Sequence, residues 1–61
     1  MHLNDYPKAL VRNAPGFGDF EGWLLVTFPA VDGRGDLKVV AGEWNGKIET
    51  HVFSHRHVTE L

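Results

Sequence analysis

The Asn45-Gly46 dipeptide constrains the fold of this 61-residue chain more than any other feature of its sequence. Asn-Gly between two β-prone runs is the strongest short-range hairpin signal, because a type I′ turn needs positive φ at both central residues. The run after the turn alternates two kinds of side chain, with Ile48, Thr50 and Val52 on one side and Lys47, Glu49 and His51 on the other. This period of two predicts a half-buried strand and fixes the register of the hairpin.

Short β-prone runs separated by glycine and proline turns account for the rest of the chain. The predicted strands cover residues 9–12, 21–28, 37–43, 47–53 and 58–61, and residues 54–57 form one helical turn with Ser54 as its N-cap. Residues 1–8 are predicted as a flexible N-terminal tail. Residues 9–61 are predicted as one all-β domain, a small five-stranded SH3-like barrel. The main alternative is an OB-fold, which usually needs a longer chain and a helix between its third and fourth strands.

The strand at residues 21–28 is apolar on both faces. We expect Leu24, Val26 and Phe28 to face the core, and Trp23, Leu25 and Thr27 to face outwards. Strands with one solvated side alternate apolar and polar residues, so an outer face carrying an indole and a leucine is expected to be covered by another subunit. A chain this small buries only about 60% of its unfolded surface, and without cysteine it has no disulfide to compensate. Self-association is therefore the leading structural expectation.

Charge and hydropathy narrow the classes of partner. The net charge is −2 and the six basic residues are scattered, whereas nucleic-acid binders usually carry a basic stripe. Nucleic-acid binding, with Phe17, Phe20 and Trp44 as stacking platforms, is therefore a weaker hypothesis. The chain has no apolar run approaching the roughly 20 residues of a membrane span. Its first residues lack the pattern of a signal peptide, so a cytoplasmic protein is expected.

Three histidines and two carboxylates are the candidates for chemistry. His51, His55 and His57 lie within seven residues, and imidazole suits zinc and copper. We favour the interpretation that they are partly exposed polar residues at one end of the barrel, with no metal. Asp19 and Glu21 flank one aromatic residue and could share a strand face as an acid–base pair, but a solvated loop edge is the favoured interpretation.

The two tryptophans are the largest apolar surfaces in the chain, and tryptophan is enriched at the energetic centres of interfaces. We expect Trp23 to lie in a subunit interface. Trp44 has two open interpretations, an anchor for a partner or a cover for the hairpin turn. The glycine-rich loop at residues 16–20, with its two aromatic rings, is expected to cap one end of the core.

The order of these features resembles a group of small proteins. The matching segments are Leu10-Val11-Arg12, Gly22 to Phe28, Leu37 to Ala41, His51 to Ser54 and Val58 to Leu61. Together they resemble the SH3-like proteins encoded by bacteria, phages and plasmids and, more distantly, the plasmid-borne type II dihydrofolate reductases. The resemblance covers residues 9–61 and rests on strand pattern and glycine placement.

The reductase resemblance implies four barrels around a pore in which folate meets NADPH. The signature Val-Gln-Ile-Tyr of that family corresponds to Thr50, His51, Val52 and Phe53 in this chain. His51 replaces the glutamine and Phe53 the tyrosine, Val52 is a conservative match, and the functional lysine of the family falls on Asn13. A neutral imidazole has one donor and one acceptor and cannot reproduce the hydrogen bonds of an amide.

Two hypotheses follow. The leading one is a non-enzymatic SH3-like module that interacts with itself or another protein, without a cofactor, through an interface drawn from Trp23, Leu25, Thr27, Trp44, His51 and Phe53. The alternative is an NADPH-dependent oxidoreductase resembling type II dihydrofolate reductase, acting through His51, Val52 and Phe53 in a tetrameric pore.

Overall fold

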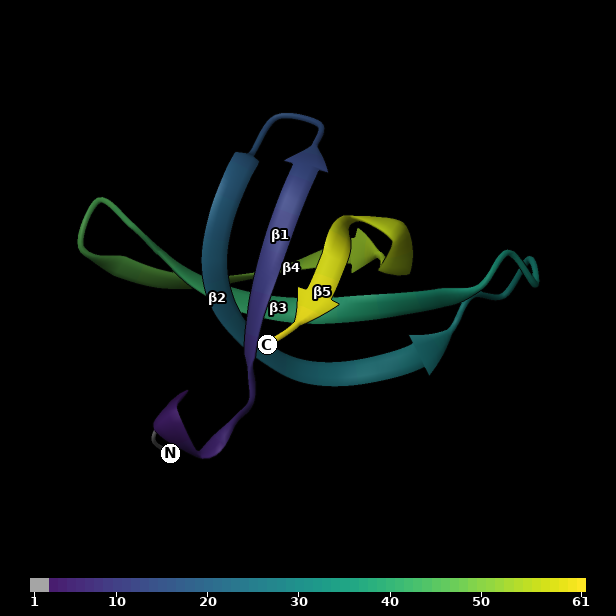
Figure 1. Ribbon diagram of the computed structural model, residues 1–61, viewed down its shortest axis with the longest axis horizontal. Coiled ribbons are helices and arrows are strands. Elements are labelled where there is room, and N and C mark those ends of the chain that lie inside the picture. Colours follow the sequence, from purple (N-terminus) through teal and green to yellow (C-terminus); the bar gives the residue numbers. More distant parts are fainter. Residues whose placement is uncertain (1–2) are drawn as a thin grey trace.

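The computed structural model describes residues 3–61, whose five strands form one antiparallel sheet in the order β4-β3-β2-β1-β5 (Figure 1). The strands are β1 (Lys8–Ala14), β2 (Gly18–Pro29), β3 (Asp36–Trp44), β4 (Lys47–Ser54) and β5 (Val58–Glu60). Single 3₁₀ turns precede β1 and β5, and these are η1 (Leu3–Asp5) and η2 (His55–His57). Residues 3–61 contain no α-helix. The prediction of an all-β chain with five strands is confirmed.

The β3–β4 hairpin has the geometry that Asn-Gly predicts. Asn45 has a φ of 53° and Gly46 a φ of 79°, and the flanking residues Trp44 and Lys47 pair directly. Positive φ at both central residues of a two-residue loop is the mark of a type I′ turn. The pairing then continues in one unbroken register to the pair Leu37–Ser54.

Strand β2 is the long bent element that joins the two halves of the sheet. It has 12 residues, and it pairs with β1 over its first part and with β3 over its second part. Figure 1 shows it curving around the molecule between these two partners. The strand starts at Gly18 rather than at the predicted residue 21, so part of the predicted glycine-rich loop belongs to the sheet.

The facing of β2 changes at Leu25. The register with β3 shifts between Leu24 and Val26, so Leu25 is an extra residue, as in a β-bulge. Leu24 is buried, as predicted. Beyond the bulge Val26 is 53% exposed and Phe28 is 37% exposed, so their predicted place in the core is wrong. A bulge reverses the facing of every residue that follows it, and the alternation of a sequence does not reveal it.

The bulge also places Thr27 on the opposite face from the one expected. Thr27 pairs with Lys38, which pairs with the buried Phe53, and residues directly opposite each other share a face of the sheet. Lys38 Nζ donates a hydrogen bond to Thr27 Oγ1 at 3.2 Å. Trp23 pairs instead with Ala41 on the other face. The predicted outer row of Trp23, Leu25 and Thr27 is therefore not one face of β2.

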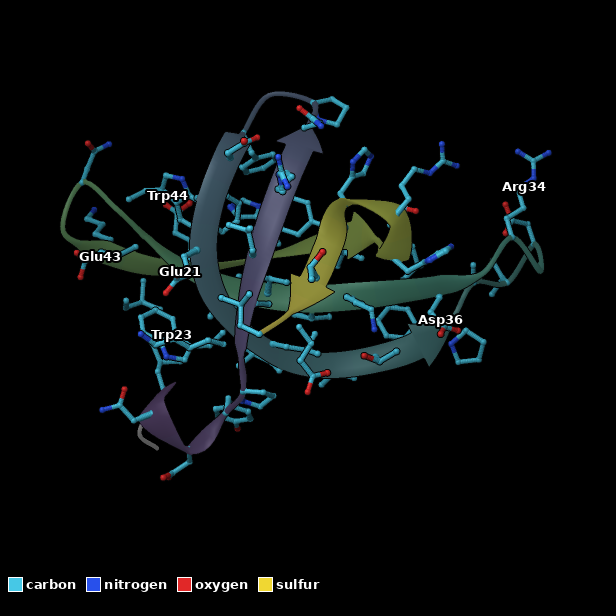
Figure 2. The ribbon with its side chains drawn as sticks, in the orientation of Figure 1. Glu21, Trp23, Arg34, Asp36, Glu43 and Trp44 are labelled. Atoms are coloured by element: carbon cyan, nitrogen blue, oxygen red, sulfur yellow. The ribbon has the colours of Figure 1, made fainter. Side chains whose placement is uncertain are left out.

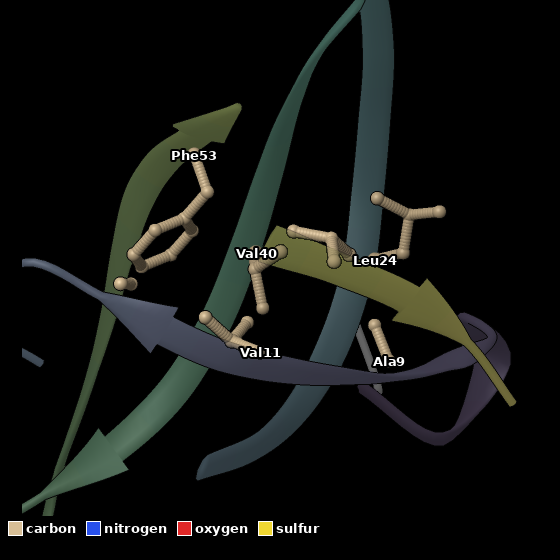
Figure 3. Close-up of a cluster of buried hydrophobic side chains, with 7 residues drawn as sticks. Ala9, Val11, Leu24, Val40 and Phe53 are labelled. Atoms are coloured by element: carbon tan, nitrogen blue, oxygen red, sulfur yellow. The ribbon is translucent and has the colours of Figure 1, made fainter. Parts of the chain in front are cut away.

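A thin core lies inside the curved sheet. Figure 3 shows side chains from β1, β2, β3 and β4 pointing towards one another. Buried apolar residues are Ala9, Val11, Ala14, Leu24, Val40, Ala41, Phe53 and Val58. The largest fully buried side chains are the valines Val11 and Val40, so the core is built mostly from small residues.

The N-terminal segment is attached to the sheet by backbone hydrogen bonds. Leu24 N donates to Pro7 O at 2.8 Å, and Tyr6 N donates to Leu3 O at 2.9 Å within the first turn. Strand β1 begins at Lys8, the last residue of the predicted tail. Residues 1 and 2 of that tail lie outside the described residues.

The predicted helical turn before the last strand is present as η2. Ser54 occupies its N-cap position, but within the described chain its side chain makes no capping hydrogen bond. Across residues 3–61, the structure has no helix with the length and apolar character needed to cross a membrane.

Candidate interaction surfaces

The face of the sheet that turns away from the core carries four exposed apolar side chains on β2 and β4. We call this set the outer apolar face, and its members are Val26, Phe28, Ile48 and Val52, with exposed fractions of 53%, 37%, 50% and 55%. The register joins Val26 and Val52 through β3, because Val39 lies between them, whereas Ile48 lies opposite Glu43. These side chains lie on the same face of the sheet, and exposed apolar surface commonly marks an interaction site.

Strand β4 contributes to this face in a way that the sequence left open. The predicted alternation is present, but Ile48 and Val52 are on the exposed side, while His51 is half-buried and Phe53 is buried. The side facing the core is thus the one that begins with charged residues and ends with aromatic ones. Sequence reasoning did not identify Val26, Phe28, Ile48 and Val52 as a surface, although the apolar side of the strand at residues 47–53 was the signal available.

A second surface is a group of aromatic rings at one end of the core. We call it the aromatic cluster, and its members are Phe17, Phe20, Trp44, His51 and Phe53. Ring centroids are separated by 4.7 Å for Phe17–His51, 4.9 Å for Phe20–Trp44 and 5.1 Å for Phe17–Phe53. These distances fall in the range of favourable aromatic pairs.

Gly42 makes the aromatic cluster possible. A Cβ at this position would lie 2.7 Å from the Trp44 ring and 3.0 Å from the Phe20 ring. The absence of a side chain therefore lets both rings lie on the β3 backbone. Trp44 flanks the turn, and because it packs against Phe20 and His51, it lies on the side of the hairpin that faces the core. Phe20 packs against the buried cluster, so the rings extend the core, as expected for the loop aromatics.

The aromatic cluster reaches the surface through Phe17, which is 37% exposed. Its rings contact one another, and residues 3–61 contain no pocket in which a small molecule could be enclosed. Besides its ring contacts, His51 lies with Nε2 at 3.2 Å from Glu49 Oε1. The cluster as a whole therefore packs against one end of the core and leaves the Phe17 ring accessible.

The three C-terminal histidines are directed to different places. His51 lies in the aromatic cluster, His55 lies against Gly35 in the β2–β3 loop, and His57 Nδ1 is 3.1 Å from Arg12 O. No group of three or more histidine and carboxylate side chains within residues 3–61 is placed to hold a metal ion. The His51, His55 and His57 candidate set is not brought together.

The predicted interface residues on β2 have separate surroundings. Trp23 is half-buried, its Nε1 atom is buried, and this atom has no hydrogen-bond acceptor among residues 3–61. In Figure 2, Trp23 lies on the side of the N-terminal segment. Leu25 is half-buried at the bulge, and Thr27 accepts the hydrogen bond from Lys38. Of the three, Trp23 is the one on the face that carries Val26 and Phe28.

The two candidate carboxylates have different partners. Asp19 Oδ1 accepts a hydrogen bond of 2.9 Å from Asn13 N and so supports the bend at the end of β1. Glu21 Oε1 lies 3.6 Å from Lys8 Nζ, with both side chains more than half exposed. An exposed ion pair of this kind contributes little to stability. Asp19 therefore accepts a backbone hydrogen bond near the β1–β2 turn, and Glu21 belongs to an exposed ion pair between the two strands.

The residues aligned with the reductase signature do not share one surface of the chain. Val52 belongs to the outer apolar face, whereas His51 and the buried Phe53 lie on the other side of β4, in the aromatic cluster. Asn13, at the position of the functional lysine of that family, has a φ of 60° in the irregular end of β1. Comparison of the chain with family models, curated proteins and solved structures found no match.

Proposed function

We propose that this chain is a non-enzymatic, SH3-like module that acts by assembling with copies of itself. The strand order, with β1 between β2 and β5 and a single 3₁₀ turn before β5, supports the SH3-like part of the proposal. The observation that carries the assembly part is the outer apolar face, where Val26, Ile48 and Val52 are each at least half exposed. Burying one large apolar side chain completely contributes roughly 1.5 to 3 kcal/mol, and a half-exposed side chain can gain about half of that.

The thin core is a second support. A core whose largest fully buried side chains are valines leaves a 61-residue chain with little stability of its own, because the apolar area buried on folding must offset the entropy of ordering the chain. Small domains without disulfides or metals commonly gain the difference by oligomerising. Burying the outer apolar face in an assembly would supply that missing area.

Light scattering tests the proposal by measuring the solution mass. A single chain has a mass of 6.8 kDa, and we expect the parent protein to have a multiple of that mass. Substituting Ile48→Glu together with Val52→Glu should reduce it to a single chain and lower the melting temperature. The matched control is Val31→Glu with Thr59→Glu, which adds the same charge at two exposed positions outside the outer apolar face and should keep the parent mass.

The same measurement decides between this function and the reductase. A parent protein that is a single chain at every concentration overturns the proposal and also removes the pore of a type II dihydrofolate reductase. A tetramer that binds both NADPH and folate, detected by repeating the measurement with each ligand and by quenching of tryptophan fluorescence, replaces the proposal with the reductase. A multimer indifferent to both ligands supports assembly as the function.

A further inference from the structure

We propose that the partner of this module is a second copy of the chain that pairs antiparallel with β4, in a register centred on Thr50. The inference rests on the proposed self-association and adds the segment and the register through which it occurs. A two-fold axis at Thr50 would join the two sheets into one, with the same strand contributed by each copy, as in the two-fold interfaces that most homodimers use.

The free edge of β4 is the first observation. Strand β4 has eight residues, and among residues 3–61 it pairs with β3 alone. The opposite edge of the sheet is the three-residue β5. Proteins usually protect a sheet edge by keeping it short, by bulges, by proline or by charged side chains, and of these β4 has only the charges of Lys47 and Glu49. Here β5 is short, whereas β4 is long, its register with β3 is continuous, and its sequence contains no proline.

The outer edge of β4 presents backbone N–H and C=O groups that can pair with another strand. The two-residue turn makes Trp44 and Lys47 a hydrogen-bonded pair, and hydrogen-bonded and non-hydrogen-bonded pairs alternate along antiparallel strands. The N–H and C=O groups of Ile48, Thr50 and Val52 therefore point away from β3. In the proposed register Thr50 lies opposite the partner's Thr50, so the outward groups on the two strands meet as hydrogen-bonded pairs.

The side chains of β4 are self-complementary in this register. Ile48 lies opposite the partner's Val52, which places apolar side chains together on the outer face. Glu49 lies opposite the partner's His51 on the other face. Within one chain Glu49 and His51 already interact at 3.2 Å, so each carboxylate would have an imidazole on both sides. Hydrogen-bonded polar pairs and apolar pairs directly across two strands are stabilising.

Neighbouring registers lack this complementarity. A pair centred on Glu49 would place two carboxylates directly opposite each other, and like charges in that position are destabilising. A pair centred on His51 would place two imidazoles together and Thr50 opposite the partner's Val52. A shift by a single residue would bring the apolar face of one strand beside the polar face of the other. Thr50 is therefore the centre that matches both faces.

The pairing also extends the outer apolar face across the two copies. The row Val26, Val39 and Val52 would continue into the partner's Ile48, and the symmetric row would run in the opposite direction. Ile48 and Val52 would be covered at their outer sides by one another, which removes part of the apolar surface that the isolated chain exposes.

Cross-linking tests the register. The chain has no cysteine, so Thr50→Cys introduces a single thiol, which should lie directly opposite its own copy and be joined efficiently by mild oxidation or a short thiol-specific reagent. Ile48→Cys is the matched control, because two copies of residue 48 would be separated by four positions along the strand. We expect at least a tenfold faster formation of covalent dimer by Thr50→Cys.

A charge exchange tests the pairing without cysteines. Glu49→Lys should lower the fraction of dimer at least tenfold, and adding His51→Glu to it should restore the dimer, since residue 49 lies opposite residue 51 of the other copy. Glu60→Lys makes the same change on β5 and should leave the dimer unchanged. A multimer in which Ile48→Cys cross-links as fast as Thr50→Cys, or in which Glu49→Lys has no effect, overturns the β4 pairing while leaving self-association intact. A parent protein that is a single chain overturns both.

Discussion

Gly46 and Leu25 show how single residues decide the shape of this sheet. Gly46 has a φ of 79°, and its missing side chain would meet no atom within 4 Å. Its role is therefore conformational, because it permits the second position of the type I′ turn. Leu25 acts differently. As the extra residue of a bulge, it reverses which side chains of the following part of β2 face the core.

Replacing Gly46 with valine should destabilise the protein by about 1–3 kcal/mol, because a β-branched residue resists positive φ. Lys47→Ala, on an exposed residue beside the turn, should change stability several times less. Thermal unfolding of the two variants provides the measurement. Gly46→Asn is a further control, because asparagine tolerates this conformation. Equal melting shifts for the valine and alanine variants would contradict the assignment of the turn.

The sequence predicts the turn but not the bulge, and the physical reason is the range of the signals. Asn45-Gly46 is a local preference of the backbone, and the strand pattern beside it is equally local. The shift at Leu25 depends on how β3 pairs with β2, which no run of neighbouring residues encodes. For this reason the sequence predicts the strands and the hairpin correctly, but the positions of Val26 and Phe28 wrongly.

Among the strands, β4 combines two properties that sheets protected against pairing with other chains rarely show together. One is a free edge, and the other is an exposed apolar side carrying Ile48 and Val52. The sequence showed the alternation of this strand, but not that the apolar side faces away from the core. That outcome depends on Phe53, which fills the core from the other side of the strand.

Proline substitutions test the two edges of β4 one at a time, because each removes an N–H group from one edge only. Thr50→Pro removes an N–H that points to the free edge, so it should reduce the solution mass to one chain while circular dichroism still shows a folded β protein. His51→Pro removes an N–H that β3 needs and should unfold the hairpin. A Thr50→Pro variant that retains the parent mass would show that β4 is not the contact.

At the scale of the whole molecule, the distribution of apolar side chains explains why assembly is expected. The described chain buries mostly alanine and valine, together with Leu24 and Phe53, and leaves Val26, Phe28, Ile48 and Val52 at its surface. An isolated chain with this arrangement loses much of the free energy that apolar burial supplies. In the sequence, the small number of residues and the lack of cysteine predict self-association. The position of the exposed apolar surface depends on the bulge at Leu25 and on which side of β4 faces the core.

Amide hydrogen exchange, resolved by residue across β4, tests whether the outer edge of this strand is paired with a second copy. In a β4-paired dimer Ile48, Thr50 and Val52 should be protected as strongly as Glu49 and His51, because both edges of the strand are hydrogen-bonded. On dilution the first three amides should lose protection while the other two keep it. Fast exchange of Ile48, Thr50 and Val52 at every concentration, with Glu49 and His51 protected throughout, would show that the outer edge of β4 is unpaired in solution.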